Sequence, residues 1–159
     1  MDRRTFLKAA TMGTVAMGLA KGAFALDTNY PVKVDPTLFE TINRVKDPAH
    51  KTPLEMTHGP FITAPAEVKA GEPFVVEISV GEKPHAMGPV HWIEYVELSI
   101  GNEPAGRADF QPKGYVQPKV SFTVVLTKEA APSGVATLVA NQRCNLHGYW
   151  EGTRNVRVV

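Results

Sequence analysis

Two runs of alternating apolar residues constrain the fold of this chain more than any other feature of its sequence. A period of two residues places every second side chain on the same face of a β-strand. Each run therefore predicts a strand with one buried face. The apolar positions are Phe74, Val76, Ile78 and Val80 in the first run and Val120, Phe122, Val124 and Leu126 in the second.

Five further segments have the composition of strands, and turn residues separate them. No helical pattern occurs beyond residue 60. About seven short strands with this spacing favour an all-β fold, an immunoglobulin-like antiparallel β-sandwich, over a barrel or an α/β fold. The five further segments are residues 61–64, 92–100, 107–111, 135–141 and 154–159.

Residues 26–54 form a proline-rich extension ahead of these strands. The sequence predicts one short helix there, with Asp35 as its N-cap and Asp47-Pro48 at its end. The apolar face of this helix would hold Leu38, Ile42 and Val45.

The first 25 residues have the features of an export signal. Arg3 and Arg4 precede a weakly apolar run over residues 9–20, and Ala23-Phe24-Ala25 supplies a small-x-small cleavage site. This order predicts a twin-arginine signal peptide over residues 1–25 and a periplasmic protein. The alternative is a membrane anchor, but the run falls short of the roughly 18 residues that a spanning helix requires. We expect no stable membrane insertion after cleavage.

Charge and cysteine content restrict the chemistry of the mature chain. The sequence carries 17 basic and 16 acidic residues, and removal of the signal takes away four basic residues but only one acidic residue. A slightly acidic chain is not expected to bind nucleic acid. The single cysteine, Cys144, cannot form an intrachain disulfide. In an oxidising compartment its thiol is vulnerable to oxidation unless a metal binds it.

The strongest chemical signal is the pair Cys144 and His147, because a Cys-x-x-His turn can place a thiolate and an imidazole on one metal ion. Upstream, His85 and His91 lie six residues apart and His58 stands alone. A lone histidine is more often a surface or hydrogen-bonded residue than a ligand. A thiolate disfavours calcium and magnesium, and five candidate ligands exceed the four that zinc normally takes.

Together these segments resemble the superoxide reductase family, which includes neelaredoxin and the iron domain of desulfoferrodoxin. The family's Cys-Asn-x-His-Gly-x-Trp motif is matched in full at residues 144–150. Residues 85–94 keep the interval between two motif histidines and the Trp-Ile-Glu that follows them, and the first motif is matched at His58 and Pro60. The resemblance covers residues 55–159, so we predict an iron-binding domain over this range.

The resemblance implies a superoxide reductase with one mononuclear, non-haem iron. The iron would donate one electron to superoxide, which leaves as hydrogen peroxide. Cys144 would tune the iron, while Lys51 and Lys83 would attract the anionic substrate. His50 matches no motif and is predicted to be a surface residue. The implied equatorial ligands are His58, His85, His91 and His147, and the implied axial ligand is Cys144.

The resemblance also implies two kinds of partner besides superoxide. A separate electron-donor protein, either rubredoxin-like or a cytochrome, is expected because the sequence has no Cys-x-x-Cys centre. Members of the family form dimers and tetramers, so we expect a homo-oligomer.

The sequence departs from the family just before its first histidine, where Glu and Lys usually stand. Met56 and Thr57 occupy these positions, and Glu55 lies one residue farther back. In an extended segment, a shift of one residue turns a side chain to the opposite face. We therefore predict that Glu55 does not bind the oxidised iron and that water, hydroxide or a weak anion takes the sixth position.

Two other functions fit parts of the pattern. A cupredoxin-like periplasmic electron-transfer protein also has Cys and His near the end of a β-sandwich, but it expects a methionine soon after His147 and leaves two histidines unused. A non-catalytic sandwich binding module would use Cys144 as an attachment point, which requires a mobile, exposed thiol. Metal analysis and visible spectra before and after oxidation distinguish the three.

Overall fold

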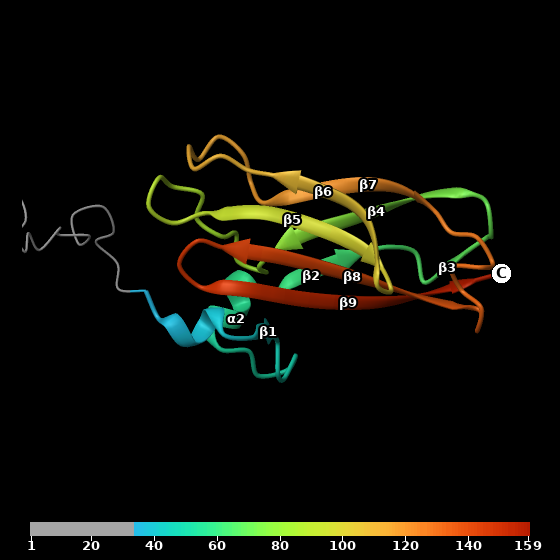
Figure 1. Cartoon of the computed structure of the whole chain (residues 1–159), viewed down its shortest axis with the longest axis horizontal. Coiled ribbons are helices and arrows are strands. Elements are labelled where there is room, and N and C mark those ends of the chain that lie inside the picture. The colour runs from blue at the N-terminus through green and yellow to red at the C-terminus, as the bar shows by residue number, and fades with distance from the viewer. Residues whose placement is uncertain (1–33) are drawn as a thin grey trace, which may run out of the picture. The chain divides into compact units, whose positions relative to one another are not determined.

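The computed structural model describes residues 34–159 of the chain. The predicted signal peptide and the start of the predicted extension lie outside the described residues. Within residues 34–159 the chain forms a short 3-10 helix, an α-helix and nine strands (Figure 1). In chain order these elements are η2 (Pro36–Phe39), β1 (Ile42–Arg44), α2 (Pro53–His58), β2 (Pro60–Thr63), β3 (Glu67–Val68), β4 (Pro73–Val80), β5 (Ile93–Ile100), β6 (Glu103–Asp109), β7 (Lys119–Val125), β8 (Val135–Cys144) and β9 (Gly148–Val158).

The strands form two sheets that pack face to face. The larger sheet has the order β1-β9-β8-β5-β6, with β3 also paired to β9, and the smaller sheet has the order β2-β4-β7. Neighbouring strands are antiparallel, except that β1 and β3 run parallel to β9. The prediction of an all-β sandwich is confirmed. The seven expected strands are β2 and β4 to β9, and the two short parallel strands are additional.

The core lies between the two sheets and follows the first alternating run closely. Val76, Ile78 and Val80 are at most 2% exposed, and they face residues of the larger sheet such as Leu98 and Leu138, which have no exposed surface. Burial of each such side chain contributes roughly 1.5–3 kcal/mol relative to leaving it in water. The sandwich therefore gains its stability from the alternation that the sequence displays.

Strands β8 and β9 are longer than their apolar pattern predicts. Their antiparallel ladder runs from the pair Val135 and Arg157 to the pair Cys144 and Gly148, and the turn Asn145–His147 closes it. Backbone hydrogen bonds hold this ladder, so polar side chains along it do not end the strands. The hairpin thus carries Cys144 and His147 on the two sides of one tight turn.

The predicted helix over residues 35–46 is wrong beyond its first turn. Asp35 does cap η2, because the Thr37 amide donates to its carboxylate (3.0 Å). The chain then forms β1, which pairs with β9, and the Asn43 side-chain amide donates to the carbonyls of Leu38 (2.8 Å) and Tyr149 (2.9 Å). Pairing with the edge of a long strand overrides the weak local helix preference.

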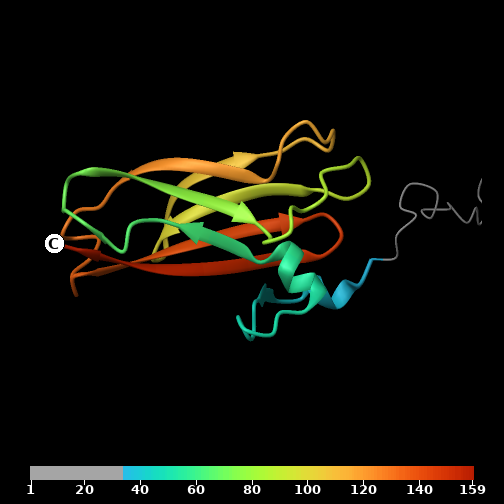
Figure 2. The same ribbon diagram turned by 180° about the vertical axis from the view of Figure 1, so that it is seen from behind.

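An α-helix that was not predicted, α2, leads directly into β2 (Figure 2). Thr52 and Glu55 form a capping box at its start, and Pro53 occupies its first turn. This arrangement is the standard signature of a helix N-terminus. His58, which the sequence placed in a loop, is therefore the last residue of a helix. Among residues 34–159, no helix has the length and apolar character needed to cross a membrane.

Candidate metal centre

Three segments bring their polar side chains together at one end of the sandwich. His58 ends α2, His85 and His91 lie in the loop between β4 and β5, and Cys144 and His147 flank the β8–β9 turn (Figure 1). Each residue offers one ligand atom, and these five atoms all lie within 4.8 Å of one another. The structure thus assembles all five predicted ligands at one point.

The four imidazole rings form a closed square. Adjacent rings stand edge to face, with centroid separations of 4.4–4.7 Å around the circuit from His58 through His85, His91 and His147. His58 and His91 face each other across the square at 5.8 Å, with only 27° between their planes. This arrangement directs one nitrogen of each ring toward a common centre.

The tautomers of the His58 and His85 rings follow from their hydrogen-bond partners. Nδ1–H of His58 donates to the carbonyl of Leu54 (2.9 Å), and Nδ1–H of His85 donates to the carbonyl of Ala86. A neutral imidazole carries only one N–H, so both Nε2 atoms are bare lone pairs. These two Nε2 atoms lie 3.0 Å apart. Two lone pairs at this distance repel each other unless a cation lies between them.

The distances between the ring nitrogens indicate the coordination geometry that such a cation would have. His58 and His85 present Nε2 atoms 3.0 Å apart, and Nε2 of His91 lies 3.0 Å from Nδ1 of His147. Two nitrogens bound at about 2.1 Å lie about 3 Å apart at right angles and about 3.4 Å apart in a tetrahedron. The pairs therefore fit a square arrangement, which suits a metal with more than four ligands.

Cys144 supplies the fifth donor from a position without solvent contact. Its side chain has no exposed surface, and its Sγ lies 3.2 Å from Nε2 of His91 and 3.5 Å from Nδ1 of His147. Burial raises the pKa of the Cys144 thiol to about 11. The sulfur becomes a thiolate at neutral pH only when a cation compensates its charge.

The histidines are held neutral, as metal ligands must be. Burial, reinforced by the neighbouring imidazoles, lowers the pKa of His58 to about 3 and that of His85 to about 4. The pKa values of His91 and His147 are also lowered by burial, although both rings are half-exposed. Their four lone pairs remain available to a metal near neutral pH.

Asn145 ties two of the ligand segments together. Its side-chain oxygen accepts from the Trp92 amide (2.9 Å), its side-chain amide donates to the Val90 carbonyl (3.0 Å), and its backbone amide donates to the Trp92 carbonyl (3.2 Å). These bonds fix the segment around His91 against the residue that follows Cys144. Asn145 was part of the matched motif, but its bonding role was not foreseen.

Gln142 and Trp150 support the histidines from the core side. The Gln142 side-chain amide donates to the His58 carbonyl (2.9 Å), and the Trp150 indole donates to the His147 carbonyl (2.9 Å) while stacking on the His58 ring. Gln142 was missed by sequence reasoning. Its signal was a polar residue at an inward position of β8, between Ala140 and Cys144, where an apolar residue is the rule.

Glu55 is directed away from the centre. Its carboxylate accepts from the amides of Lys46 (3.0 Å) and Thr52 (2.7 Å) and from the Thr52 hydroxyl (2.9 Å). These hydrogen bonds hold the pKa of Glu55 below its ordinary value. The expectation that the segment before His58 is extended was wrong, because this segment forms helix α2. The Glu55 carboxylate belongs to the capping box at the start of that helix.

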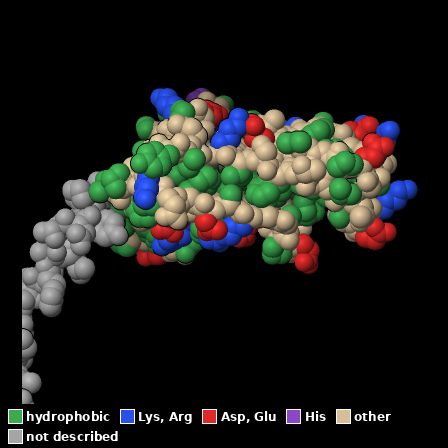
Figure 3. Space-filling view, turned by 90° about the horizontal axis from the view of Figure 1, so that it is seen from above, with side chains coloured by type: hydrophobic (Ala, Val, Ile, Leu, Met, Phe, Trp, Pro, Cys, Tyr) green, Lys and Arg blue, Asp and Glu red, His purple; other side chains and the backbone are tan. Residues whose placement is uncertain are grey.

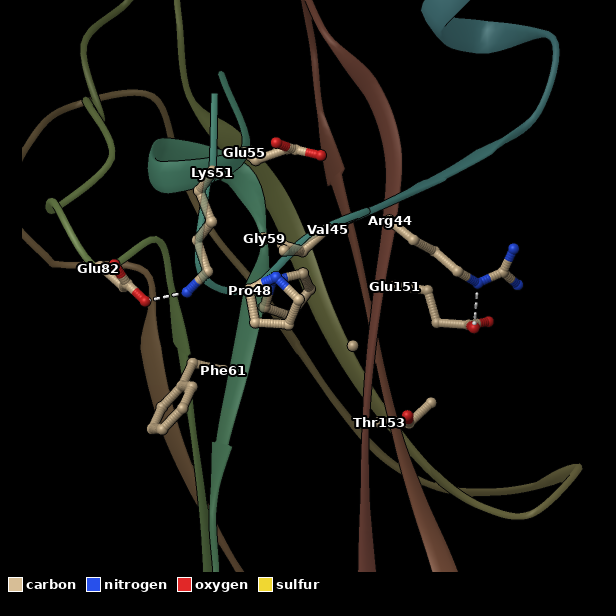
Figure 4. A pocket seen from close by; sticks show the side chains of 12 residues that line it. Arg44, Val45, Pro48, Lys51, Glu55, Gly59, Phe61, Glu82, Glu151 and Thr153 are labelled. Atoms are coloured by element: carbon tan, nitrogen blue, oxygen red, sulfur yellow. Dashed lines mark hydrogen bonds and ion pairs between the residues drawn. The ribbon is translucent and has the colours of Figure 1, made fainter. Parts of the chain in front are cut away.

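The two predicted lysines lie in different surroundings. Lys51 forms an ion pair with Glu82 and lines a cavity of about 390 Å³ beside α2, which none of the five predicted ligands lines (Figure 4). Lys83 is exposed in the loop that leads to His85 and has no ion pair within the described part of the chain. His50 is exposed and bonds to Asp47, as expected of a surface residue.

Known proteins resemble this chain in both sequence and fold. A profile of the desulfoferrodoxin family matches residues 50–153. A candidate superoxide reductase of Methanocaldococcus jannaschii is 36% identical over 115 residues, which cover 72% of this chain and 92% of that protein. The solved structure of a superoxide reductase (neelaredoxin) from Ignicoccus hospitalis has a TM-score of 0.62 at 35% identity, covering 80% of this chain and 100% of that one. A candidate superoxide reductase of Thermotoga maritima, 24% identical over 76% of this chain and 96% of its own, has a TM-score of 0.59 and shows the fold alone.

Proposed function

This chain belongs to the desulfoferrodoxin family, and from that premise we propose that it reduces superoxide to hydrogen peroxide at a mononuclear iron centre. The observation that carries the proposal is the convergence of four neutral imidazoles and one buried thiol on a single point. Imidazole and thiolate together suit iron, and five donors in this geometry exceed the tetrahedral set of zinc. The ligands are His58, His85, His91, His147 and Cys144.

The reaction consumes one electron and two protons for each superoxide and yields one hydrogen peroxide. Iron, when held by the four histidines and Cys144, would supply that electron, because it can pass from the ferrous to the ferric state. Cys144 compensates the metal's charge and donates electron density to it, whereas the four imidazoles are neutral. The ligand set therefore leaves a ferrous centre with a net positive charge, which attracts an anion.

Burial determines the side from which the substrate approaches. His58, His85 and Cys144 are buried, whereas His91 and His147 are half-exposed. Superoxide therefore reaches the centre past the open edges of these two rings. The core behind the other three ligands excludes water and keeps the sulfur away from oxidants.

The protons for hydrogen peroxide come from solvent in this proposal. Glu55, the carboxylate nearest in sequence to the first ligand, is engaged at the start of α2. Lys51 is paired with Glu82, whereas Lys83 has no ion pair among the described residues, so we assign to Lys83 the role of attracting superoxide and ordering water. An iron held by these five residues would leave its remaining coordination position to water, hydroxide or an added anion such as azide.

The proposal extends to the protein's partners and location. A separate one-electron donor protein, rubredoxin-like or a cytochrome, would reduce the centre after each turnover, because the one cysteine of this sequence belongs to the centre and cannot build a Cys-x-x-Cys iron site as well. We also propose a periplasmic homo-oligomer, a dimer or tetramer, exported by the twin-arginine pathway. Sedimentation of the purified protein tests the assembly.

Metal analysis combined with superoxide kinetics tests the function. We expect about one iron per chain, a visible band in the oxidised protein that is lost on reduction, and consumption of superoxide by the reduced form without release of oxygen. A blue copper spectrum would instead support the electron-transfer alternative. A protein free of metal that folds normally would support the binding-module alternative and contradict the proposal.

A further inference from the structure

Two loops lie at the same end of the sandwich as the metal centre, and one of them carries two of its ligands. The loop between β4 and β5 (residues 81–92) carries His85 and His91, and the loop between β6 and β7 (residues 110–118) lies next to it in both ribbon views (Figures 1 and 2). A Cβ atom at Gly114 would lie 3.6 Å from the carbonyl oxygen of Met87, so the two loops approach each other at this point.

These loops expose apolar side chains in solvent. Tyr115 is 88% exposed, Val116 is 51% exposed and Val90 is 38% exposed. Among the large hydrophobic residues within residues 34–159, Tyr115 has the largest exposed fraction. Figure 3 shows hydrophobic side chains at this end of the molecule and along the rest of the same face. An exposed aromatic group with apolar neighbours is typical of an interaction surface.

The charges of the two loops are few and mostly positive. Only Glu82, Lys83 and Lys113 are charged there, and Glu82 is already paired with Lys51. Neither Lys83 nor Lys113 has an ion pair within the part of the chain that the structure describes. Tyr115 and Val116 share a surface hollow with Lys113, Lys119 and Asp109, of which Asp109 is paired with Arg107 and Lys119 with Glu77. The unpaired charge beside the apolar side chains is therefore basic, which complements an acidic partner.

The surface is connected to the metal ligands by a short path. The carbonyl of Val90 accepts a hydrogen bond from the Asn145 side chain (3.0 Å), and Asn145 directly follows Cys144 in the chain. Val90 also directly precedes His91, whose half-exposed ring belongs to the centre. A partner that covers Val90 is thus one hydrogen bond from the residue next to the thiolate and one peptide bond from a histidine ligand.

We infer that Val90, Tyr115 and Val116, with Lys83 and Lys113 at their rim, form the docking surface for an acidic one-electron carrier protein that reduces the metal centre. This inference rests on the proposed function, which needs one electron for each superoxide. In the transfer step the carrier loses one electron and the ferric centre gains it, with no bond made or broken. Small, apolar contacts with a charged rim suit such a complex, because the partners must separate after each transfer.

The test measures reduction of the oxidised, iron-loaded protein in the absence of superoxide. Stopped-flow absorbance follows the loss of the ferric band with reduced rubredoxin as the acidic protein donor and with ascorbate as the small-molecule donor. We expect Tyr115→Ser and Lys113→Glu each to lower the second-order rate constant with rubredoxin by about tenfold at low ionic strength. Added salt should reduce the effect of Lys113→Glu. The rate with ascorbate should not change.

Matched variants at other positions control for loss of surface apolarity and charge. Val75, which is 57% exposed near the start of β4, and Lys128, in the loop between β7 and β8, lie outside both docking loops. Val75→Ser and Lys128→Glu should leave both rates unchanged. In a second readout, zinc-substituted rubredoxin should shift the amide NMR signals of residues 81–92 and 110–118 in the zinc-substituted protein.

Three results would overturn the inference. Unchanged reduction by rubredoxin in both docking variants removes the surface from electron transfer. An equal loss with ascorbate assigns Tyr115 and Lys113 to the centre itself. A smaller assembly in Tyr115→Ser, measured by light scattering, shows that a second copy of the chain covers the patch. Failure of the parent protein to reduce superoxide with either donor would contradict the proposed function alone, since the transfer rates are measured without superoxide.

Discussion

At the scale of single residues, the chemistry of the Cys144 side chain depends strongly on its surroundings. Burial is the main cause that raises the pKa of its thiol to about 11, so a cation is needed to make it a thiolate near neutral pH. Its sulfur contacts the ring nitrogens of His91 and His147, and the residue has no exposed surface. The sulfur is therefore suited to metal binding and not to carrying a covalent group.

We predict that Cys144→Ser abolishes superoxide reduction while the sandwich stays folded. A serine hydroxyl is smaller and remains neutral, so it cannot supply the electron density of a thiolate, whereas the strands hold the core without the sulfur. Superoxide consumption by the reduced protein and far-UV circular dichroism measure the two effects. A variant that keeps the parent's rate would remove Cys144 from the centre.

Replacement of a single imidazole should release the metal. His91→Ala and His147→Ala each remove a nitrogen whose neighbours lie about 3 Å away, and we expect iron affinity to fall by at least about tenfold. His50→Ala is the matched control, because its ring is exposed and bonds only to Asp47 among the contacts described. Iron content after gel filtration gives the result. Equal loss of iron in His50→Ala would contradict the assignment.

At the scale of elements, helix α2 couples the stability of the chain to the position of a ligand. Its start is held by the Thr52 and Glu55 capping box, and its last residue is His58. The Glu55 carboxylate also accepts from the Lys46 amide, which joins the helix to the segment after β1. A change at Glu55 should therefore alter stability without altering the metal's ligand set.

We predict that Glu55→Gln lowers the melting temperature but leaves the ferric spectrum near neutral pH unchanged. The pKa of Glu55 is lowered by hydrogen bonds to its carboxylate, so its stabilising effect is present above the unfolded-state pKa and is lost as pH falls through the lower, folded-state value. The difference in melting temperature between parent and variant should shrink as the pH is lowered below about 4. A shifted ferric spectrum would show that Glu55 reaches the iron.

The β8–β9 turn requires glycine immediately after His147. Gly148 has φ +73°, and a Cβ atom there would overlap the carbonyl oxygen of Leu38. We predict that Gly148→Ala destabilises the protein by more than about 2 kcal/mol and lowers its iron content. The control is Gly101→Ala, which shares a positive φ of +57° but has open space around its Cβ position. Urea unfolding and metal analysis compare the two, and an equally small effect in both would show that Leu38 can move.

At the scale of the whole molecule, the proposed export by the twin-arginine pathway would set the order of folding, metal binding and transport. The twin-arginine pathway carries folded proteins, so the metal would be bound before the chain crosses the membrane. We predict that Arg3→Lys combined with Arg4→Lys retains the protein in the cytoplasm with its iron bound. Fractionation of cells followed by immunoblotting and metal analysis measures both. Normal secretion of this variant would favour the general pathway.

The sandwich fold could be predicted because its sequence signals act over short distances along the chain. Alternation over Val76, Ile78 and Val80 marks a strand with one buried face wherever that strand pairs, so the fold class could be predicted without contacts. The turn between Cys144 and His147 was equally local. The capping box ahead of His58 was also legible in the sequence, but the short helix was overlooked because its six residues show no apolar period.

The metal centre itself exists only in the tertiary structure, which brings its five ligand residues together. His58, His85 and Cys144 are separated by tens of residues, and spacing along the chain cannot show that their donor atoms meet; a family motif was needed to suggest it. The pairing of β1 with β9 was hidden for the same reason, because its partner is more than a hundred residues away. The sequence by itself determined which residue types could bind a metal and which segments could form strands. Only the packed sandwich determined their distances, their burial and hence their protonation, because these depend on neighbours that the chain brings together through folding.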